Sequence, residues 1–261
     1  MNNREKLLSH VQDNQTKHQL ARVIDLAEGV LERQVPDVTD FYDPYLIMLA
    51  EGILKRMPEV GFSFVGGYSE AERKRILIFP SNHVPSEINA KIALLVINPC
   101  GLNSSLKHRD YLGALLGLGI RREKIGDLLV EEAGCKAVVD QGVAVFIKGY
   151  LKQVGREIVS ITEVSSNADF RSKEGIIKKG TVASLRLDAV ASLGFGMSRN
   201  NVQREILAER FKVNWQLVKK PDFQLKEGDV ISCRGRGRVI IIHLSGQTKK
   251  GRIGLLLEKY T

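Results

Sequence analysis

Cysteine is scarce in this chain, and its few copies lie far apart. The 261 residues include three cysteines, Cys100, Cys135 and Cys233, and no two of them form a Cys-x-x-Cys pair. Disulfide frameworks and zinc knuckles need closer, paired ligands. The five histidines are also scattered, with no His-x-x-x-His spacing. We therefore expect structural roles for these side chains and predict no metal site and no cofactor.

Long hydrophobic runs are missing as well. No apolar stretch of the sequence approaches the roughly 20 residues that a membrane-spanning helix needs. The first residues, Met1–Lys6, are mostly polar and lead into an amphipathic segment, unlike the apolar core of a signal peptide. Hydrophobic residues make up 43% of the chain and charged residues 26%, which is typical of globular proteins. These features predict a cytoplasmic protein without a membrane partner.

The first two thirds of the chain have almost no net positive charge. The excess of lysine and arginine is concentrated in the last third. Residues 180–261 carry 15 lysines and arginines against 7 acidic residues, whereas the whole chain has a formal net charge of +9. Clustered cations gain most by displacing counterions from phosphates. This asymmetry predicts that the C-terminal module contacts a polyanion.

Periodicity predicts an α+β protein whose first part, residues 1–72, is mainly helical. Apolar residues recur at steps of three and four from Leu7 to Leu31, as on one face of a helix. Asp43 followed by Pro44 is a good helix start, because the carboxylate accepts from free amides and proline at the first position loses no hydrogen bond. This second helix is expected to end near Met57.

The central part, residues 73–166, is expected to be an RNA-recognition-motif-like, or ferredoxin-like, α/β sandwich. Its elements are expected at residues 92–97 (strand), 108–117 (helix), 126–130 and 135–139 (strands), 142–151 (helix) and 157–164 (strand). This order of strand, helix, two strands, helix and strand is the one that defines such sandwiches. Residues 167–180 are polar and charged and are expected to form a linker to a module at residues 181–261.

Two short helices are expected to carry the basic side chains of the C-terminal module. Residues 184–191 predict the first helix, and Ser198 stands where the cap of a second helix belongs, with Arg199 and Gln203 on one outer edge and Arg204 alongside. Arg186 and Asp188 are expected to form an ion pair. This pair either orients Arg186 toward RNA or lies on a solvent-exposed helix edge without a role in binding.

Further along the module, arginine alternates with glycine. Arg234, Arg236 and Arg238 are expected to lie on a strand, to point to one side and to form a ridge that contacts phosphates or protects a sheet edge. Glu209 stands where a glycine would end a helix in the left-handed conformation, and Trp215 follows Asn214 where a tight Asn-Gly turn would have glycine. We therefore expect a different helix end and a different hairpin at these two places, with Trp215 as a base-stacking platform or as packing on Leu217.

These residues resemble a known RNA-binding domain. Arg186-Leu187-Asp188, Ser198-Arg199, Val213-Asn214 and Gly228-Asp229-Val230-Ile231, at these intervals, resemble the domain named after ribosomal small-subunit protein four. Residues 184–238, with their Arg-Gly-Arg-Gly-Arg end, and residues 108–129 resemble the YlmH family of bacterial RNA-binding proteins, which is named for a cell-division gene cluster.

The resemblance implies a non-enzymatic protein that binds structured rRNA and tRNA on the ribosome. It further implies the large subunit with peptidyl-tRNA as partners, in ribosome-associated quality control of stalled translation. A monomer without a small-molecule substrate is expected. Two alternatives remain open, an RNA-modifying enzyme of the pseudouridine-synthase kind and a cell-division accessory protein that acts through protein partners. No catalytic residue is predicted, and the predicted RNA-binding residues are Arg186, Asp188, Ser198, Arg199, Gln203, Arg204, Lys212, Asn214, Arg234, Arg236 and Arg238.

Overall fold

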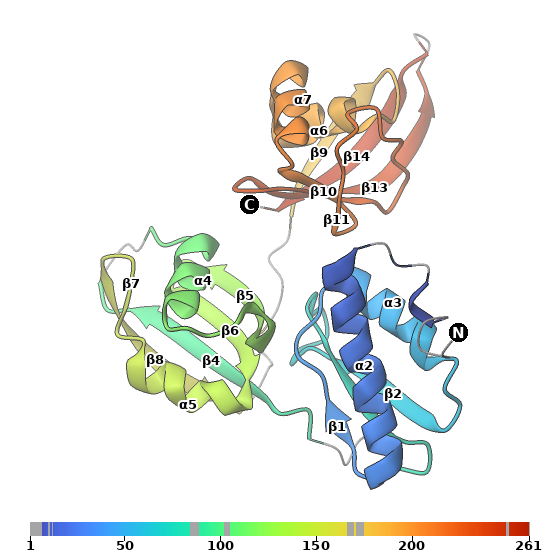
Figure 1. The fold of residues 1–261 in the computed structure, drawn as a ribbon. Helices are drawn as coiled ribbons and strands as arrows, with labels where there is room; N and C mark the ends of the chain where they lie inside the picture. Colours follow the sequence, from blue (N-terminus) through green and yellow to red (C-terminus); the bar gives the residue numbers. More distant parts are fainter. Residues whose placement is uncertain are drawn as a thin grey trace. The chain divides into compact units, whose positions relative to one another are not determined.

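The chain is a mixed α/β protein with antiparallel sheets (Figure 1). The computed structural model describes residues 7–9, 11, 13–83, 89–101, 105–165, 170, 175–248 and 251–260. These residues belong to two compact units, residues 1–172 and 173–261. Within the described residues, no helix is long and apolar enough to cross a membrane.

The N-terminal half of the first unit packs two helices on a small sheet. Helix α2 is Asn14–Arg33 and helix α3 is Pro44–Leu54. The strands are β1 (Asp37–Val38), β2 (Val60–Val65) and β3 (Arg75–Pro80), in the order β1-β3-β2. Asp43 accepts a hydrogen bond from the Leu46 amide, as its sequence position ahead of Pro44 predicts.

The expected limit of this N-terminal part, at residue 72, falls inside a β-hairpin. Strand β3 follows that limit but pairs with β1 and β2, and Ile76 and Ile78 are buried against α2 and α3. The boundary therefore moves past β3, because the alternating apolar residues of this strand complete the core beneath the two helices.

The central half of the first unit contains a five-stranded sheet with two helices. Its elements are β4 (Ile92–Pro99), α4 (His108–Gly117), the short 3-10 helix η2 (Arg122–Lys124), β5 (Ile125–Glu131), β6 (Gly134–Asp140), α5 (Gln141–Tyr150), β7 (Gln153–Val154) and β8 (Glu157–Val164). The strand order is β5-β6-β4-β8-β7. Tyr111 and Leu115 of α4 and Ala144 and Ile147 of α5 are buried in the core of this half.

The sheet carries a second apolar cluster, with residues from the N-terminal half. Leu94 of β4 and Val138 of β6 are buried together with Phe41, Tyr68 and Phe170. Successive residues of a strand face opposite sides of the sheet, and the neighbours of Leu94 and Val138 belong to the core with α4 and α5. Phe41, Tyr68 and Phe170 therefore cover part of the face that the two helices leave open.

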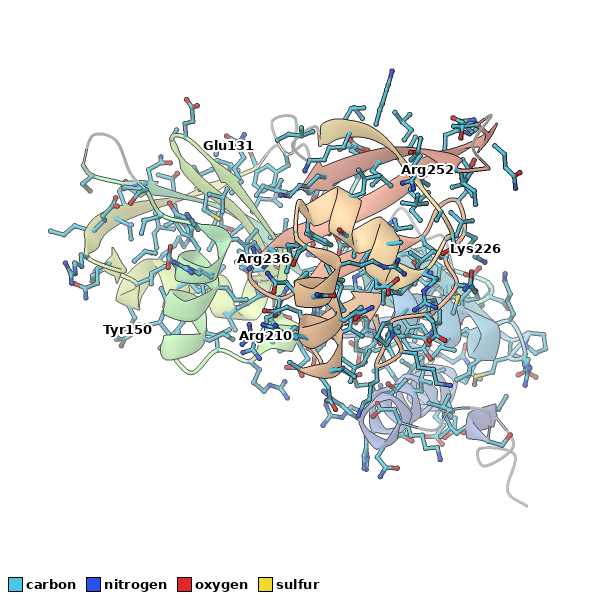
Figure 2. The ribbon with its side chains drawn as sticks, turned by 90° about the horizontal axis from the view of Figure 1, so that it is seen from above. Glu131, Tyr150, Arg210, Lys226, Arg236 and Arg252 are labelled. Carbon is cyan, nitrogen blue, oxygen red and sulfur yellow. The ribbon has the colours of Figure 1, made fainter. Side chains whose placement is uncertain are left out.

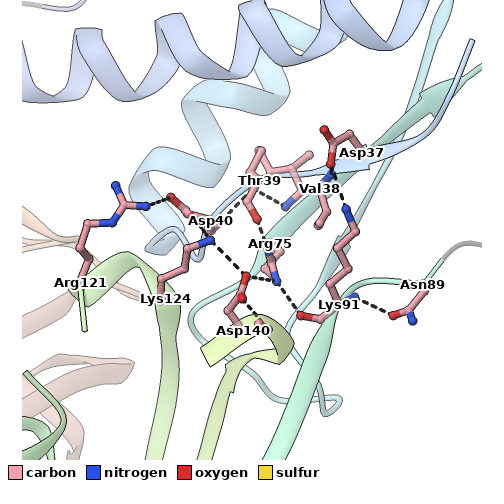
Figure 3. A network of polar contacts seen from close by, with 12 residues as sticks. Asp37, Val38, Thr39, Asp40, Arg75, Asn89, Lys91, Arg121, Lys124 and Asp140 are labelled. Atoms are coloured by element: carbon pink, nitrogen blue, oxygen red, sulfur yellow. Dashed lines mark hydrogen bonds and ion pairs between the residues drawn. The ribbon is translucent and has the colours of Figure 1, made fainter. Parts of the chain in front are cut away.

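A polar network joins the same two halves (Figure 3). The Arg75 side chain is almost fully buried and lies 2.9 Å from the Asp140 carboxylate, while its Nε donates to the Thr39 carbonyl at 2.6 Å. Lys124 Nζ lies 2.8 Å from Asp40 and 3.2 Å from Asp140. A buried charge is tolerated only when it is paired and hydrogen-bonded, so this network favours one fixed docking of the two halves.

The second unit packs two helices on one face of a six-stranded sheet (Figure 1). Its elements are β9 (Ile176–Val182), α6 (Leu187–Phe195), α7 (Arg199–Leu207), β10 (Phe211–Val213), β11 (Gln216–Leu217), β12 (Val230–Cys233), β13 (Gly237–Gln247) and β14 (Ile253–Tyr260). The strand order is β11-β10-β12-β13-β14-β9. Val190 of α6 and Val202 of α7 are buried against Phe211, Val239 and Leu257 of the sheet.

Part of the expected linker is a strand of this sheet. Strand β9 begins at Ile176 and pairs along its length with β14, from Ile176 opposite Lys259 to Val182 opposite Ile253. Phe170, also within the expected linker at 167–180, is buried in the first unit. The rest of that linker up to residue 174 lies outside the described residues. The polar appearance of residues 176–180 reflects a strand at the edge of a sheet, where exposed side chains are common.

Two local predictions about the helices are corrected. Helix α6 starts at Leu187 and ends at Phe195, later at both ends than the expected 184–191. Glu209 adopts φ +58°, so helix α7 does end in the left-handed conformation despite the missing glycine. The Glu209 amide donates to the Ile206 carbonyl and the Arg210 amide to the Glu205 carbonyl, the two bonds of a Schellman motif.

The turn between β10 and β11 is also tighter than expected. Val213 pairs directly with Gln216, so Asn214 and Trp215 are the two residues of the turn. Their φ angles are +48° and +65°, which is the pattern of a two-residue type I′ hairpin. A side chain in the left-handed region costs roughly 1–2 kcal/mol relative to the right-handed one, so Trp215 occupies a position that favours glycine.

Candidate RNA-binding surface

Asp188 is the centre of the predicted site, and it is fully buried. The Arg186 Nε donates to its carboxylate at 3.2 Å, the Arg199 Nη2 at 3.0 Å, and the Gln203 Nε2 at 2.7 Å. Because all of these groups point at Asp188, the carboxylate is a shared acceptor inside the protein. Asp188 therefore positions the two arginines, in line with the ion pair expected between Arg186 and Asp188, and its part in RNA binding stays a prediction.

Local sequence explains why these side chains meet. Asp188 lies in the first turn of α6, where a negative charge is favoured by the helix dipole. Ser198 caps α7 by accepting from the Asn201 amide at 3.3 Å, as predicted. Arg199 and Gln203 are then one turn apart on α7, so both reach the start of α6.

The electrostatics of this cluster favour a permanently ionised carboxylate. Burial by itself raises the pKa of Asp188, but the hydrogen bonds from Arg186, Gln203 and Arg199 outweigh it and lower the pKa to about 2. The Asp188 hydrogen bond raises the pKa of Arg186. All three charges of the cluster are therefore present at neutral pH, with a net charge of +1.

The arginines keep part of their surface open to solvent. The Arg186 side chain is 35% exposed and the Arg199 side chain 49% exposed. A guanidinium has five donors in a planar fork, so one edge can bind Asp188 while another binds a phosphate. Arg204, farther along α7, is also exposed. This surface is suited to hold a phosphate backbone in one orientation.

The arginine-glycine segment is a turn, not the predicted ridge. Arg234 and Arg236 lie between β12 and β13, while Arg238 lies within β13 with its guanidinium 4.7 Å from the Tyr260 ring centre. Gly235 and Gly237 have φ angles of +79° and +81°, so the glycines bend the backbone. The three side chains therefore do not share one side of a strand.

This turn nevertheless brings other cations together. The Arg234 amide donates to the Arg210 carbonyl, so the turn lies beside the start of β10. Figure 2 shows Arg210 and Arg236 along the same edge of the second unit. Arg210 also pairs with Glu205 at 3.1 Å. Arg210 was not among the predicted residues, and its place next to the turn of Arg234 and Arg236 becomes evident only from the pairing of β10 with β12.

Asn214 and Lys212 have different surroundings. The Asn214 side chain donates through Nδ2 to Asp229 at 2.9 Å and accepts through Oδ1 from the Val230 main-chain amide at 2.9 Å. This side chain therefore holds the hairpin to β12. Asn214 thus has a structural role in the turn, and its contact with RNA stays a prediction. Lys212 is exposed, between the buried Phe211 and Val213.

Two further cations adjoin the Asp188 cluster, which consists of Asp188, Arg186, Arg199 and Gln203. The Asp188 amide donates to the Pro221 carbonyl, which places the segment with the exposed Lys219 and Lys220 beside the start of α6. Lys219 also pairs with Glu209. The sequence signal for this part of the surface is the adjacent Lys219-Lys220 pair ahead of Pro221.

Basic side chains of the first unit near the central sheet are, in part, less exposed to solvent than those of the second unit. Arg73 and Arg122 donate to main-chain carbonyls of residues 125 and 126, and burial lowers the pKa of Arg122 to about 10. The exposed Arg121 lies 3.6 Å from Asp40. In the described part of the chain, no group of three or more His, Cys, Asp or Glu side chains is placed to hold a metal ion.

Three family models match this chain. Residues 15–83 match the family model "YlmH, N-terminal", residues 85–168 the model "Putative RNA-binding domain in YlmH", and residues 185–231 the S4 domain. The "Ribosome-associated protein quality control protein P2" of Bacillus subtilis (strain 168) is 33% identical over 231 residues, which is 88% of this chain and 90% of that protein.

A solved structure shares the fold of part of this chain. The "Cell division protein ylmH from Streptococcus pneumoniae" superposes with a TM-score of 0.53 at 24% sequence identity, over 60% of this chain and 95% of that one. The matched models together span both units, and the Bacillus relative is similar over nearly its whole length. The chain belongs to the YlmH family.

Proposed function

We propose that this protein binds structured RNA on the ribosome and acts in ribosome-associated quality control of stalled translation. Its partners would be ribosomal RNA and peptidyl-tRNA on the large subunit, and it would act in the cytoplasm as a monomer. The name of the Bacillus relative supports the pathway. The matches to two RNA-binding family models support binding rather than catalysis.

The observation that carries the proposal is the Asp188 cluster. Arg186 and Arg199 share one buried carboxylate and keep solvent-exposed edges. A surface ion pair contributes little to stability, whereas two arginines held by one carboxylate present two planar donor groups that can bind phosphates of a folded RNA. Such contacts position the protein on the RNA by shape and carry little sequence information.

We propose a supporting role for the central half. Its strand order β5-β6-β4-β8, with α4 and α5 on one face, supports an RNA-recognition-motif-like sandwich. Such domains stack bases on the open face of the sheet. Here Phe41, Tyr68 and Phe170 occupy part of that face. We therefore assign the main RNA contact to the second unit and exclude base stacking on the covered part of the central sheet.

Replacement of Arg199 tests the proposal. Arg199→Ala removes the more exposed of the two arginines and should abolish co-sedimentation with large ribosomal subunits in a sucrose gradient at physiological salt. The matched control is Lys55→Ala, which removes one exposed positive charge from the end of α3 in the first unit and should leave sedimentation unchanged.

The opposite pattern would reject the placement of the site. If folded Arg199→Ala protein sediments with subunits as the unchanged protein does, the α6–α7 surface is not the ribosome contact. Circular dichroism of both variants establishes that they are folded.

A further inference from the structure

A second group of arginines lies at the opposite end of helix α7 from the Asp188 cluster. Arg199, which belongs to that cluster, is the first residue of α7, whereas Arg210 follows the end of the helix and leads into β10. Arg234 and Arg236 lie in the turn between β12 and β13. Because α7 has nine residues, the helix between the two groups is about 14 Å long. We call Arg210, Arg234 and Arg236 the Arg210 cluster.

The main chain brings the Arg210 cluster together. The Arg234 amide donates to the Arg210 carbonyl at 2.9 Å, and the Arg236 amide donates to the Cys233 carbonyl at 2.9 Å. Burial and a nearby carboxylate raise the pKa of the Cys233 thiol to about 11. Arg236 and Arg210 both act to lower that pKa, so both guanidinium groups lie near the same side chain. Figure 2 shows these two arginines on one edge of the unit.

The unit itself neutralises only part of this charge. Arg210 lies 3.1 Å from the Glu205 carboxylate, and its side chain is still 53% exposed. Arg234 and Arg236 are exposed, and neither pairs with an acidic side chain in the described part of the chain. Like charges this close repel one another unless a polyanion neutralises them. An exposed ion pair adds little to stability, so the fold gains little from arginines at this place.

The surface between the two clusters is open and polar. Asn200, Asn201 and Arg204 of α7 are exposed, while Val202 and Ile206 of the same helix are buried. Amide and guanidinium groups bond to ribose hydroxyls and to phosphate oxygens. An RNA backbone that crosses α7 would therefore meet hydrogen-bonding groups along its way.

We propose that the Arg210 cluster is a second binding site for RNA phosphates, separate from the Asp188 cluster at the other end of α7. This inference rests on the proposed RNA-binding function and adds a contact to it. A guanidinium presents several donors in one plane, so Arg210 can bind a phosphate through one edge and Glu205 through another. An RNA that reaches both clusters is held at two points of its backbone, which fixes its direction along α7.

The test measures binding of the full-length protein to two labelled stem–loop RNAs of unrelated sequence, by fluorescence anisotropy at several salt concentrations. The test variant carries Arg234→Gln and Arg236→Gln, which leave the main-chain hydrogen bonds of the turn in place. The control carries Lys179→Gln and Lys226→Gln, which remove the same charge from exposed positions of the same unit. Circular dichroism and thermal unfolding establish that both variants are folded.

The salt dependence distinguishes direct contacts from long-range attraction. Each lost phosphate contact should weaken binding about tenfold and lower the slope of log affinity against log salt by about 0.9 for a double-stranded stem. The test variant should therefore bind both RNAs about a hundredfold more weakly, with a slope lower by nearly two. The loss should be equal for the two sequences, because phosphates carry no sequence information. The control should keep the slope of the unchanged protein.

Arg210 is tested through its own ion pair. Glu205→Gln releases Arg210 from the carboxylate and removes a negative charge from the site, so it should tighten binding roughly threefold. Glu227→Gln, which removes the carboxylate beside His243, is the control and should have a smaller effect. Unchanged or weaker binding by Glu205→Gln would show that Arg210 serves the fold alone and would remove it from the site.

The other contrary outcomes are distinct. A test variant that binds as the control does, with the salt slope of the unchanged protein, would overturn the inference. A loss of affinity for only one of the two sequences would overturn it as well. If the unchanged protein binds neither RNA, the proposed function itself fails. If Arg199→Ala loses binding while the test variant keeps it, the proposed function stands and the second site alone is refuted.

Discussion

Asp188 is a single buried residue that would link stability to the proposed RNA binding. Its carboxylate is hidden from solvent, yet the groups that it orients, Arg186 and Arg199, remain partly exposed. Removing one partner of a buried charged network leaves the others uncompensated. A change at Asp188 should therefore affect both the fold of the second unit and its grip on RNA.

Asp188→Asn should destabilise the second unit in a pH-dependent way. The pKa of Asp188 is 3.8 when unperturbed and about 2 in the folded protein, which corresponds to about 2 kcal/mol of stability at neutral pH. Because the folded pKa is the lower one, this contribution is full above the unfolded value and is lost as the pH falls from there toward 2. The difference between the two proteins should shrink over that window.

Urea titrations followed by tryptophan fluorescence measure this effect, because the single tryptophan lies in the second unit. A difference in unfolding free energy that stays constant down to the lowest pH would show that ionisation of Asp188 does not stabilise the fold. Asp222→Asn, an exposed carboxylate in the same unit, is a suitable control.

Among the elements, helix α7 has a well-formed start and a strained end. Ser198 caps its first turn, while Glu209 closes it in the left-handed conformation. Glu209→Gly should stabilise the second unit by about 0.5–1 kcal/mol, after allowance for the lost pair with Lys219. Thermal unfolding of this variant beside Glu209→Ala checks it, and a lower melting temperature for glycine than for alanine would contradict it.

Prediction from the sequence worked where the signal is local. The cap at Asp43, the cap at Ser198 and the helices α4 and α5 follow from side chains within one or two turns of each element. Strand β9 was missed because its partner is β14, more than seventy residues away, and its lysines resemble a linker. Pairing over such distances leaves no local signal.

The same reasoning explains the errors at the site. The pair of Arg186 with Asp188 was evident from spacing, but the burial of Asp188 depends on α7 packing against α6. The ridge of Arg234, Arg236 and Arg238 was inferred from alternation, and alternation does not reveal that Gly235 and Gly237 adopt positive φ. The Arg210 contact with this turn depends on the pairing of β10 and β12.

For the whole molecule, the excess positive charge is concentrated in one of the two units. The second unit carries most of the excess positive charge, and strand β9 belongs to its sheet. A truncation that removes the second unit must therefore end at Ser172 rather than near Lys179, where it would leave an unpaired strand.

The fragment of residues 1–172 should fold and lose ribosome binding. Its core and polar network are contained within the first unit, so its circular dichroism spectrum should show native helices and strands. In sucrose gradients at low and at physiological salt it should remain in the top fractions. Co-sedimentation with the affinity of the intact chain would show that the first unit, and not the second, is the main contact.

The sharing of Asp188 by three donors has a last consequence. Arg186 belongs to the start of α6, whereas Arg199 and Gln203 belong to α7, so the helices cannot shift against each other without changing the direction of both guanidinium groups. Under the proposed function, partial melting of either helix would release the RNA before the sheet opens. Dissociation from the ribosome and local unfolding of this helix pair would then be two readings of one event.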